Sequence, residues 1–120
     1  MKPTLILCLI SIFACWCACK EVFEKSLDKA HVTLLGPVNN GVSGSGDQTF
    51  FWQPLDSGIN YELQVVSPTF DSIAQVMADT VVTRNLLPLT LGPGRYQWRV
   101  RAFNSSSSTP FSGAWTLTLQ

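Results

Sequence analysis

Cysteine is absent from most of this sequence. All four cysteines, Cys8, Cys15, Cys17 and Cys19, lie within the first nineteen residues. A disulfide framework spreads its cysteines through a domain, because each bridge has to join segments that are distant in the chain. Structural zinc is excluded as well, since the four thiols lie in an apolar run without the turns and polar groups that surround such sites. The remainder of the chain therefore has to fold around a hydrophobic core alone.

Histidine is also scarce, and with it the means for nucleophilic catalysis. His31 is the single histidine, and no G-x-S-x-G turn supplies a serine nucleophile. A hydrolytic triad needs a histidine near both a nucleophile and an orienting acid. The acidic residues of the predicted domain lie mostly in turns, which explains them without a catalytic role. They are Asp47, Asp56, Glu62, Asp71 and Asp79. We expect no enzymatic activity, no catalytic residue, no metal ion and no cofactor.

No excess of charge of either sign is present. Lysine plus arginine and aspartate plus glutamate both number 8, so the formal net charge is zero. The four arginines, at positions 84, 95, 99 and 101, alternate with apolar residues instead of forming a block. Such a balance provides no long-range attraction for nucleic acid, which we exclude as a partner.

The only long hydrophobic run is at the N-terminus. After a short segment with one charge, Lys2, the fifteen residues Leu5–Cys19 carry no charge and a single hydroxyl, Ser11. Spanning roughly 30 Å of hydrocarbon as a helix takes about 20 residues, so this run is too short for a lasting transmembrane helix. A charged start, a short apolar stretch and small residues at its end are typical of a secretory signal peptide. We predict that residues 1–18 are such a peptide.

Two cysteines at the end of this run resemble the lipidated cysteine of a bacterial lipobox. Cys15 has the better apolar residue three positions before it, whereas Cys19 directly precedes Lys20-Glu21. A cysteine followed by lysine and an acid is similar to the junction in lipoproteins of the Bacteroidetes type, which implies display on the cell surface. We therefore favour Cys19, with Cys15 as the alternative, and interpret residues 19–30 as a lipidated N-terminus and tether. The resemblance implies a firm anchor in the outer membrane, because each buried methylene of an acyl chain contributes about 0.8 kcal/mol.

From residue 31 onward, apolar residues recur with a period of two, which is typical of β-strands. We predict seven strands, at residues 31–35, 48–53, 60–66, 73–77, 80–84, 95–103 and 113–119. Residues 38–47 are predicted to form a loop, Ser67-Pro68 to end the third strand, and residues 86–91 to lead into a glycine-rich turn. Short strands at this spacing without an amphipathic helix predict an all-β fold, a seven-stranded antiparallel sandwich over residues 31–120.

Alternation within the predicted strands separates an inner face from an outer face. The predicted inner face comprises Phe50, Trp52, Tyr61, Leu63, Val65, Tyr96, Trp98, Val100, Ala102, Trp115, Leu117 and Leu119. On the strand at 95–103, Gln97, Arg99 and Arg101 lie on the opposite, outer face. Large aromatic side chains bury roughly 150–250 Å² each, so this set can stabilise a sandwich without disulfides.

Three segments resemble the fibronectin type III domain and related Ig-like domains. Trp52-Gln53-Pro54 resembles the end of the family's second strand, and Tyr61-x-Leu63-x-Val65 resembles its third. Residues 91–104 (LGPGRYQWRVRAFN) resemble the turn and sixth strand, where the family uses a tyrosine to pin the corner. One residue fewer than usual separates Pro93 from Tyr96, so we expect this corner to be altered or lost. The resemblance covers nearly the whole predicted domain and implies an Ig-like, fibronectin type III-like sandwich.

This kind of sandwich hosts many unrelated roles, so its function has to be inferred from predicted surfaces. We predict a non-catalytic binding or adhesion module, held at the membrane by its lipid, with a glycan or an envelope protein as ligand. The alternative is a structural accessory subunit of a larger outer-membrane complex that has no ligand of its own. One candidate surface is the outer face of a sheet, formed by Arg99, Arg101 and Glu62. Pairing across a solvated sheet would explain these residues equally well.

A second candidate surface consists of loops at the end of the sandwich that is far from the lipid. Because consecutive strands alternate in direction, we expect three loops at that far end and two near the membrane. The far loops are residues 36–47, 67–72 and 88–95, and the near loops are 54–58 and 104–110. The predicted ligand-contact residues in the far loops are Phe70, Asp71, Pro93 and Arg95.

The loop at 36–47 also raises the question of calcium. Asn39, Asn40 and Asp47 offer oxygen atoms of the kind that calcium prefers, but their spacing matches no recognised calcium loop. We predict no metal site and leave calcium in this loop as an alternative.

The predicted lipid anchor gives the first test. Cys19→Ser should release the protein from membranes or leave it unprocessed, because the substitution removes the thiol that would be acylated. Membrane fractionation measures the release, and intact-mass analysis of the wild type identifies the modified residue. Cys15→Ser is the matched control and should leave the anchor unchanged. A mature N-terminus at Cys15 would contradict the choice of Cys19.

Overall fold

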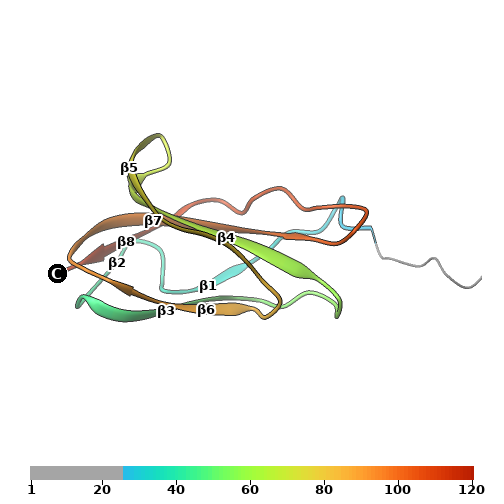
Figure 1. Ribbon diagram of the computed structural model, residues 1–120, viewed down its shortest axis with the longest axis horizontal. Coiled ribbons are helices and arrows are strands. Elements are labelled where there is room, and N and C mark those ends of the chain that lie inside the picture. The colour runs from blue at the N-terminus through green and yellow to red at the C-terminus, as the bar shows by residue number, and fades with distance from the viewer. Residues whose placement is uncertain (1–25) are drawn as a thin grey trace, which may run out of the picture.

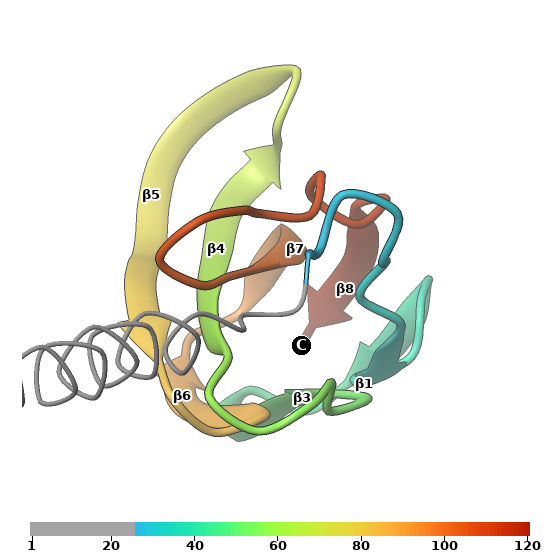
Figure 2. The ribbon, with the colours of Figure 1, turned by 90° about the vertical axis from the view of Figure 1, so that its right-hand side faces the viewer.

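The computed structural model describes residues 26–120, which form eight strands with connecting turns. The strands are β1 (Leu34–Gly36), β2 (Gly41–Ser43), β3 (Gly46–Trp52), β4 (Asn60–Thr69), β5 (Ser72–Val82), β6 (Leu86–Leu91), β7 (Gly94–Phe103) and β8 (Trp115–Leu119). They build two sheets, with strand orders β1-β3-β6 and β2-β8-β7-β4-β5. Figures 1 and 2 show the two sheets as stacked layers. The all-β sandwich predicted from the sequence is confirmed.

Strand β7 lies near the centre of the larger sheet, antiparallel to β4 on one side and to β8 on the other. Strand β2 pairs in parallel with β8, and the remaining pairs of the described residues are antiparallel. The hairpin of β4 and β5 rises above the rest of the sandwich in Figure 1. Strand β5 thus forms one edge of the larger sheet and β2 forms the other, with β7 in the middle.

The prediction of a loop at residues 38–47 is wrong for part of this segment. Strand β2 occupies Gly41–Ser43, and β3 already begins at Gly46. Backbone pairing with β8 forms β2, while Val42 and Ser43 stay exposed. A strand without a buried side chain leaves no apolar alternation in the sequence, so the pattern cannot reveal it.

The segmentation around β4, β5 and β6 also differs from the prediction. Strand β4 continues past Ser67-Pro68, and the two strands predicted at 73–77 and 80–84 are the single strand β5. The pairing of β4 with β5 shifts register twice along this stretch. Each shift inserts an extra residue and interrupts the alternation on which the prediction depends. Residues 86–91 form β6, so the sandwich has eight strands instead of seven.

The inner faces of both sheets meet in one aromatic-rich core. Phe50, Trp52 and Trp98 have no exposed surface, and Trp98 packs edge-on against Phe50 (5.0 Å between ring centroids) and Trp115 (6.0 Å). Every residue of the predicted inner face is buried, except that Trp115 is partly exposed. Within residues 26–120, the indole nitrogens of Trp52 and Trp98 have no hydrogen-bond partner. The apolar area that these rings bury outweighs the cost of two unpaired N–H groups.

The tyrosine corner is present, which corrects the expectation that it would be altered or lost. The Tyr96 hydroxyl donates a hydrogen bond of 2.7 Å to the carbonyl oxygen of Gly92. Gly94 has a φ of 154°, a conformation that side chains other than glycine rarely adopt, and a Cβ there would lie 3.3 Å from the Tyr96 hydroxyl oxygen. Because glycine can adopt this φ, the turn closes with one residue fewer. The Tyr96 hydroxyl therefore still reaches the Gly92 carbonyl oxygen.

Part of the segment interpreted as a tether packs onto the sandwich. Leu27 is 3% exposed and belongs to the core, and Ala30 packs against the same cluster. The Leu27 N–H donates to the Ser107 hydroxyl at 2.9 Å. Figure 2 shows this segment beside the connection that follows β7. Residues 26–30 are therefore attached to the domain rather than free of it.

The signal peptide at residues 1–18 and the candidate lipidation sites Cys15 and Cys19 lie outside the described residues. Within residues 26–120, no helix is long and apolar enough to cross a membrane.

The central position of Trp98 gives a stability test. Trp98→Ala should unfold the domain or lower its melting temperature strongly, because truncating a buried large aromatic residue costs about 3–5 kcal/mol against a typical total of about 5–15 kcal/mol. Trp115→Ala is the control and should cost less, since Trp115 is partly exposed. Urea unfolding followed by circular dichroism measures both. A midpoint for Trp98→Ala close to that of the wild type would contradict the central role of this ring.

Candidate functional site

The outer face of the five-stranded sheet gathers most of the polar and charged residues that the sequence singles out. On β7, Arg99 and Arg101 point away from the core, in alternation with the buried residues. Strand β4 presents Gln64 directly opposite Arg99 and Glu62 directly opposite Arg101. The candidate sheet face of Arg99, Arg101 and Glu62 is therefore one continuous surface, which we call the outer face.

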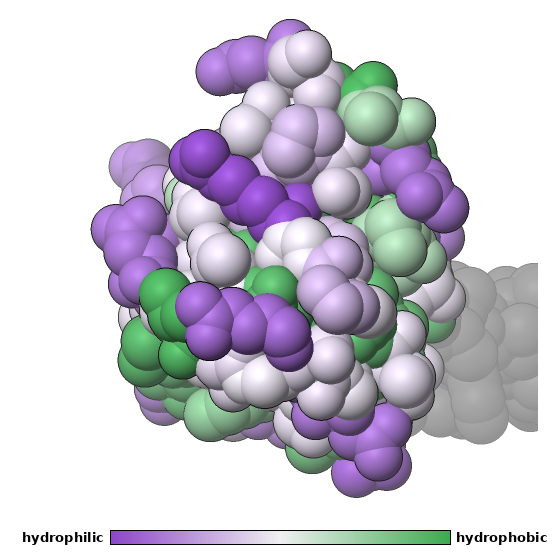
Figure 3. All heavy atoms as spheres, turned by 90° about the vertical axis from the view of Figure 1, so that its left-hand side faces the viewer, coloured by the Kyte–Doolittle hydropathy of each residue, from purple (hydrophilic) through white to green (hydrophobic). Residues whose placement is uncertain are grey.

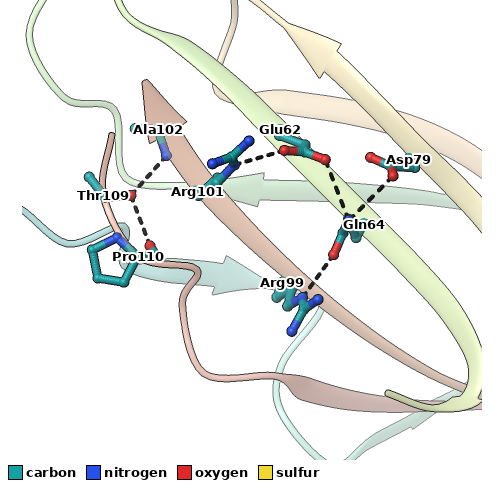
Figure 4. Close-up of polar contacts among 8 residues, drawn as sticks. All are labelled: Glu62, Gln64, Asp79, Arg99, Arg101, Ala102, Thr109 and Pro110. Carbon is teal, nitrogen blue, oxygen red and sulfur yellow. Dashed lines mark hydrogen bonds and ion pairs between the residues drawn. The ribbon is translucent and has the colours of Figure 1, made fainter. Parts of the chain in front are cut away.

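A network of hydrogen bonds orders these side chains (Figure 4). The Arg101 Nε donates to the Glu62 Oε1 at 2.7 Å, which is also an ion pair. The Arg99 Nε donates to the Gln64 Oε1 at 2.8 Å, and the Gln64 amide nitrogen contacts the carboxylates of Asp79 (3.3 Å) and Glu62 (3.4 Å). Gln64 thus links Arg99 to two acids without a direct contact between opposite charges.

Phenylalanine rings stack on both arginines. The Arg99 guanidinium carbon lies 4.1 Å from the centroid of the Phe70 ring and 4.4 Å from that of Phe111. The Arg101 guanidinium carbon lies 5.2 Å from the centroid of Phe111 and 5.7 Å from that of Phe103. We call Phe70, Arg99, Phe111, Arg101 and Phe103 the arginine–phenylalanine ladder. Cation–π contacts of this kind hold the guanidinium groups in place.

Phe70 reaches the ladder from the turn between β4 and β5. Its backbone N–H donates to the Gln97 Oε1 at 2.9 Å, and the Gln97 amide nitrogen donates to the Thr116 hydroxyl at 3.2 Å. The sequence assigns Phe70 to a loop surface separate from the sheet face. The structure unites the two surfaces, because the protruding β4–β5 hairpin turns Phe70 back onto β7.

Phe111 reaches the ladder from the connection between β7 and β8. This connection is bound to β7 by side-chain hydroxyls: the Val100 N–H donates to the Ser112 Oγ at 3.1 Å and the Ala102 N–H donates to the Thr109 Oγ1 at 3.0 Å. Thr109 is 2% exposed, so its bonds are shielded from water. The polar loop expected at 104–110 is thus an ordered segment, and Phe111 follows it directly.

A hollow of about 110 Å³ lies on the outer face between β7, β4 and β5. Its apolar lining consists of Val66, Phe70, Ile73 and Val76. Its polar lining consists of Gln64, Asp79 and Arg99. The Phe70 and Arg99 of the ladder therefore form one wall of a concavity, whereas Arg101 and Phe103 lie outside it.

Comparison with known proteins identifies the fold. No protein-family model and no curated protein matches the chain. Among solved structures, the FN1–FN3 fragment of chicken CNTN1 matches with a TM-score of 0.57 and 20% identity over 80% of this chain and 35% of that one. The domain of human fibronectin type III domain containing protein 3 matches with a TM-score of 0.53 and 19% identity over 82% of this chain and 92% of that one. The chain has a fibronectin type III fold.

The β4–β5 turn and the β6–β7 turn lie at the end of the sandwich away from residues 26–30, whereas the segment predicted as a far loop at 36–47 begins beside Phe51 and runs along β8 as β2. Residues 26–30 lie beside the near loops, because Leu27 bonds Ser107 and a shallow hollow joins residues 26–30 to the 54–56 turn. Asp71, Pro93 and Arg95 are exposed at or near the far end. Figure 3 looks onto that end and shows mainly hydrophilic and intermediate side chains, with hydrophobic ones at its edges. No apolar concavity gathers Asp71, Pro93 and Arg95.

The oxygen atoms considered for calcium serve the fold itself. The Asn39 Oδ1 accepts the Thr116 N–H at 2.8 Å, and the Asp47 Oδ1 accepts the Thr90 hydroxyl at 2.7 Å. In the part of the chain from residue 26 to the end, no group of three or more histidine, cysteine or acidic side chains is arranged to hold a metal ion. The outer face combines a held guanidinium, hydrogen-bonding groups and a concave apolar surface.

Sequence reasoning found the polar residues of the outer face but missed how the phenylalanines join them. Phe103 and Phe111 are aromatic residues outside the predicted inner face, and this was the only signal available. Their contact with Arg99 and Arg101 depends on the path of the connection after β7. Ile73 and Val76 lie in the strand predicted at 73–77, but the register shifts interrupt its alternation, so the sequence did not place them beside Arg99.

The ladder gives a second stability test. Arg99→Ala should lower the free energy of unfolding by about 1–2 kcal/mol, because it removes two stacking contacts and leaves Gln64 without its donor. Arg84→Ala is the matched control; Arg84 is exposed, so its loss should change stability by less than about 0.5 kcal/mol. Urea denaturation measures the difference. Equal effects of the two substitutions would show that the ladder does not stabilise the domain.

Proposed function

We propose that the protein is a non-catalytic, lipid-anchored binding module of the cell envelope, and that its outer face contacts a protein partner. The observation that carries this proposal is the hollow beside Arg99, where a held guanidinium adjoins exposed aliphatic side chains. A surface with this combination of a fixed charge and apolar area is typical of protein–protein contact sites.

A protein suits this face better than the glycan that the sequence leaves open. Sugar rings bind by stacking on exposed aromatic faces, but Phe70 and Phe111 present their faces to Arg99. The exposed apolar side chains of β5 are aliphatic: Ile73 is 49% exposed, and Val76 and Val81 are each 57% exposed. Aliphatic side chains bury well against other proteins and offer little to a sugar.

The attachment of Leu27 supports a restricted display of this face. If Cys19 carries the lipid, residues 20–26 separate it from the docked Leu27, and an extended chain of that length spans at most about 25 Å. The near loops would then lie toward the membrane. The outer face runs along the length of the sandwich, so a partner would approach it from the side, as a neighbouring envelope protein can.

Site-specific photo-crosslinking in intact cells tests this proposal. A photoreactive amino acid at Val76, within the hollow, should form a protease-sensitive adduct with a protein. The matched control is Val42, which is similarly exposed at 63% but lies on β2 at the opposite edge of the sheet. Equal adducts from both positions, or an adduct that resists protease and contains sugar, would reject the protein-binding face. Co-purification of the same protein at constant stoichiometry without crosslinking would identify the accessory-subunit role instead.

A further inference from the structure

The hollow on the outer face combines an apolar floor with a polar wall. Val66 lines the hollow but is only 2% exposed, whereas Ile73 and Val76, which also line it, are 49% and 57% exposed and supply its accessible apolar surface. The volume of about 110 Å³ compares with about 30 Å³ for a water molecule in the liquid. An aliphatic side chain of a few carbons can therefore enter and displace water from an apolar surface, which is favourable.

Arg99 is prepared to receive an anion at the polar wall. Its guanidinium lies between Phe70 and Phe111, and its Nε is bonded to Gln64. Within residues 26–120, its two terminal nitrogens make no hydrogen bond, and Arg99 forms no ion pair. A planar guanidinium with its fork free binds a carboxylate through two parallel hydrogen bonds. Because the side chain is already held, little conformational entropy is lost when an anion binds.

The charges around the hollow decide where an anion would sit. Glu62 is paired with Arg101, so it does not neutralise Arg99. Asp79 lines the hollow on the β5 side and holds the Gln64 amide. Its negative charge would repel an anion from β5 and favour a position on the β7 side, against Arg99. The hollow thus has aliphatic and acidic side chains toward β5 and a cationic one toward β7.

From this arrangement we infer that the hollow recognises an aliphatic side chain that lies next to a carboxylate, presented by a segment of the partner protein. This inference rests on the proposed function, because it names the chemistry of the partner at the same face. Ile73 and Val76 contact the aliphatic group, and the Arg99 terminal nitrogens hold the carboxylate. A neutral apolar segment would leave the Arg99 terminal nitrogens without an anion. An acidic segment that lacks an aliphatic side chain would leave the apolar side chains of the hollow exposed to water.

Small probes test this chemistry on the full chain in detergent, with backbone amide chemical shifts as the readout. N-acetyl-leucine carries the aliphatic group and the carboxylate together, and it should shift the amides of Val66 and Arg99 in a saturable manner. N-acetyl-leucinamide lacks the charge, and N-acetylglycine lacks the side chain. Each should bind about tenfold more weakly or worse, because each loses one of the two interactions.

Matched variants separate recognition from folding. Arg99→Gln should abolish the preference for N-acetyl-leucine over its amide, whereas Arg95→Gln, which removes the same charge from the same strand outside the hollow, should retain it. Val76→Glu leaves Arg99 intact and should weaken N-acetyl-leucine about fivefold or more by placing a like charge at the hollow. Val81→Glu adds the same charge to the same strand at an equal exposure of 57% and should leave the affinity within about twofold.

The inference is overturned if N-acetyl-leucinamide binds as tightly as N-acetyl-leucine, if Arg99→Gln keeps the preference, or if glucuronate, an acidic sugar, binds equally well. Crosslinking from Val76 distinguishes this failure from that of the proposed function. A protein adduct at Val76 without binding of N-acetyl-leucine would leave the binding face in place and reject this ligand chemistry. Binding of N-acetyl-leucine with the expected pattern but without a protein adduct would support the chemistry and reject the proposed function.

Discussion

The alternation of strand β7 between two environments is the constraint on which the rest of the structure depends. Its inward side chains, Trp98 among them, are fully buried and fill the space between the sheets. Its outward side chains, Arg99 and Arg101, pair with β4 and stack on phenylalanines. A slip of one residue would bury two guanidinium groups and expose an indole, which is far more costly than any gain. The core therefore fixes the register, and the register fixes the outer face.

The second half of β7 lacks the strand partner that a regular hairpin with β8 would provide. Strand β8 pairs with β7 only from Gly94 to Trp98, so the N–H groups of Val100 and Ala102 lack strand partners on that side. Hydroxyl groups of Ser112 and Thr109 accept these hydrogen bonds. An irregular connection can then cross the edge without leaving buried donors unpaired, a cost that folded proteins avoid. The same connection places Phe111 against Arg99 and Arg101. The segment that accepts the hydrogen bonds of β7 therefore also completes the ladder.

The fibronectin type III fold by itself implies no ligand, because the sandwich supports many surfaces. What distinguishes this chain is the arrangement of side chains on its outer face. The ladder rigidifies the arginines, and the β4–β5 hairpin adds a wall of aliphatic side chains beside them. A rigid cation next to an apolar hollow can discriminate between partners, since a segment must satisfy both the charge and the apolar floor. Arg101, paired with Glu62, orders the outer face beside this hollow.

The sequence by itself determined the all-β architecture, the composition of the core and the outward placement of Arg99, Arg101 and Glu62, because these follow from alternation within single strands. It also contained the tyrosine of the corner, whereas the role of Gly94 in closing the shorter turn depends on the backbone conformation of the folded chain. Strand β2, the unbroken β5 and the path of the connection before Phe111 were decided by tertiary structure. Exposed backbone pairing, register shifts and hydroxyl-mediated bonds leave no periodic trace in a sequence. The hollow arises where Val66, Val76 and Arg99 come from three different strands, and only their packing brings an apolar floor next to a guanidinium.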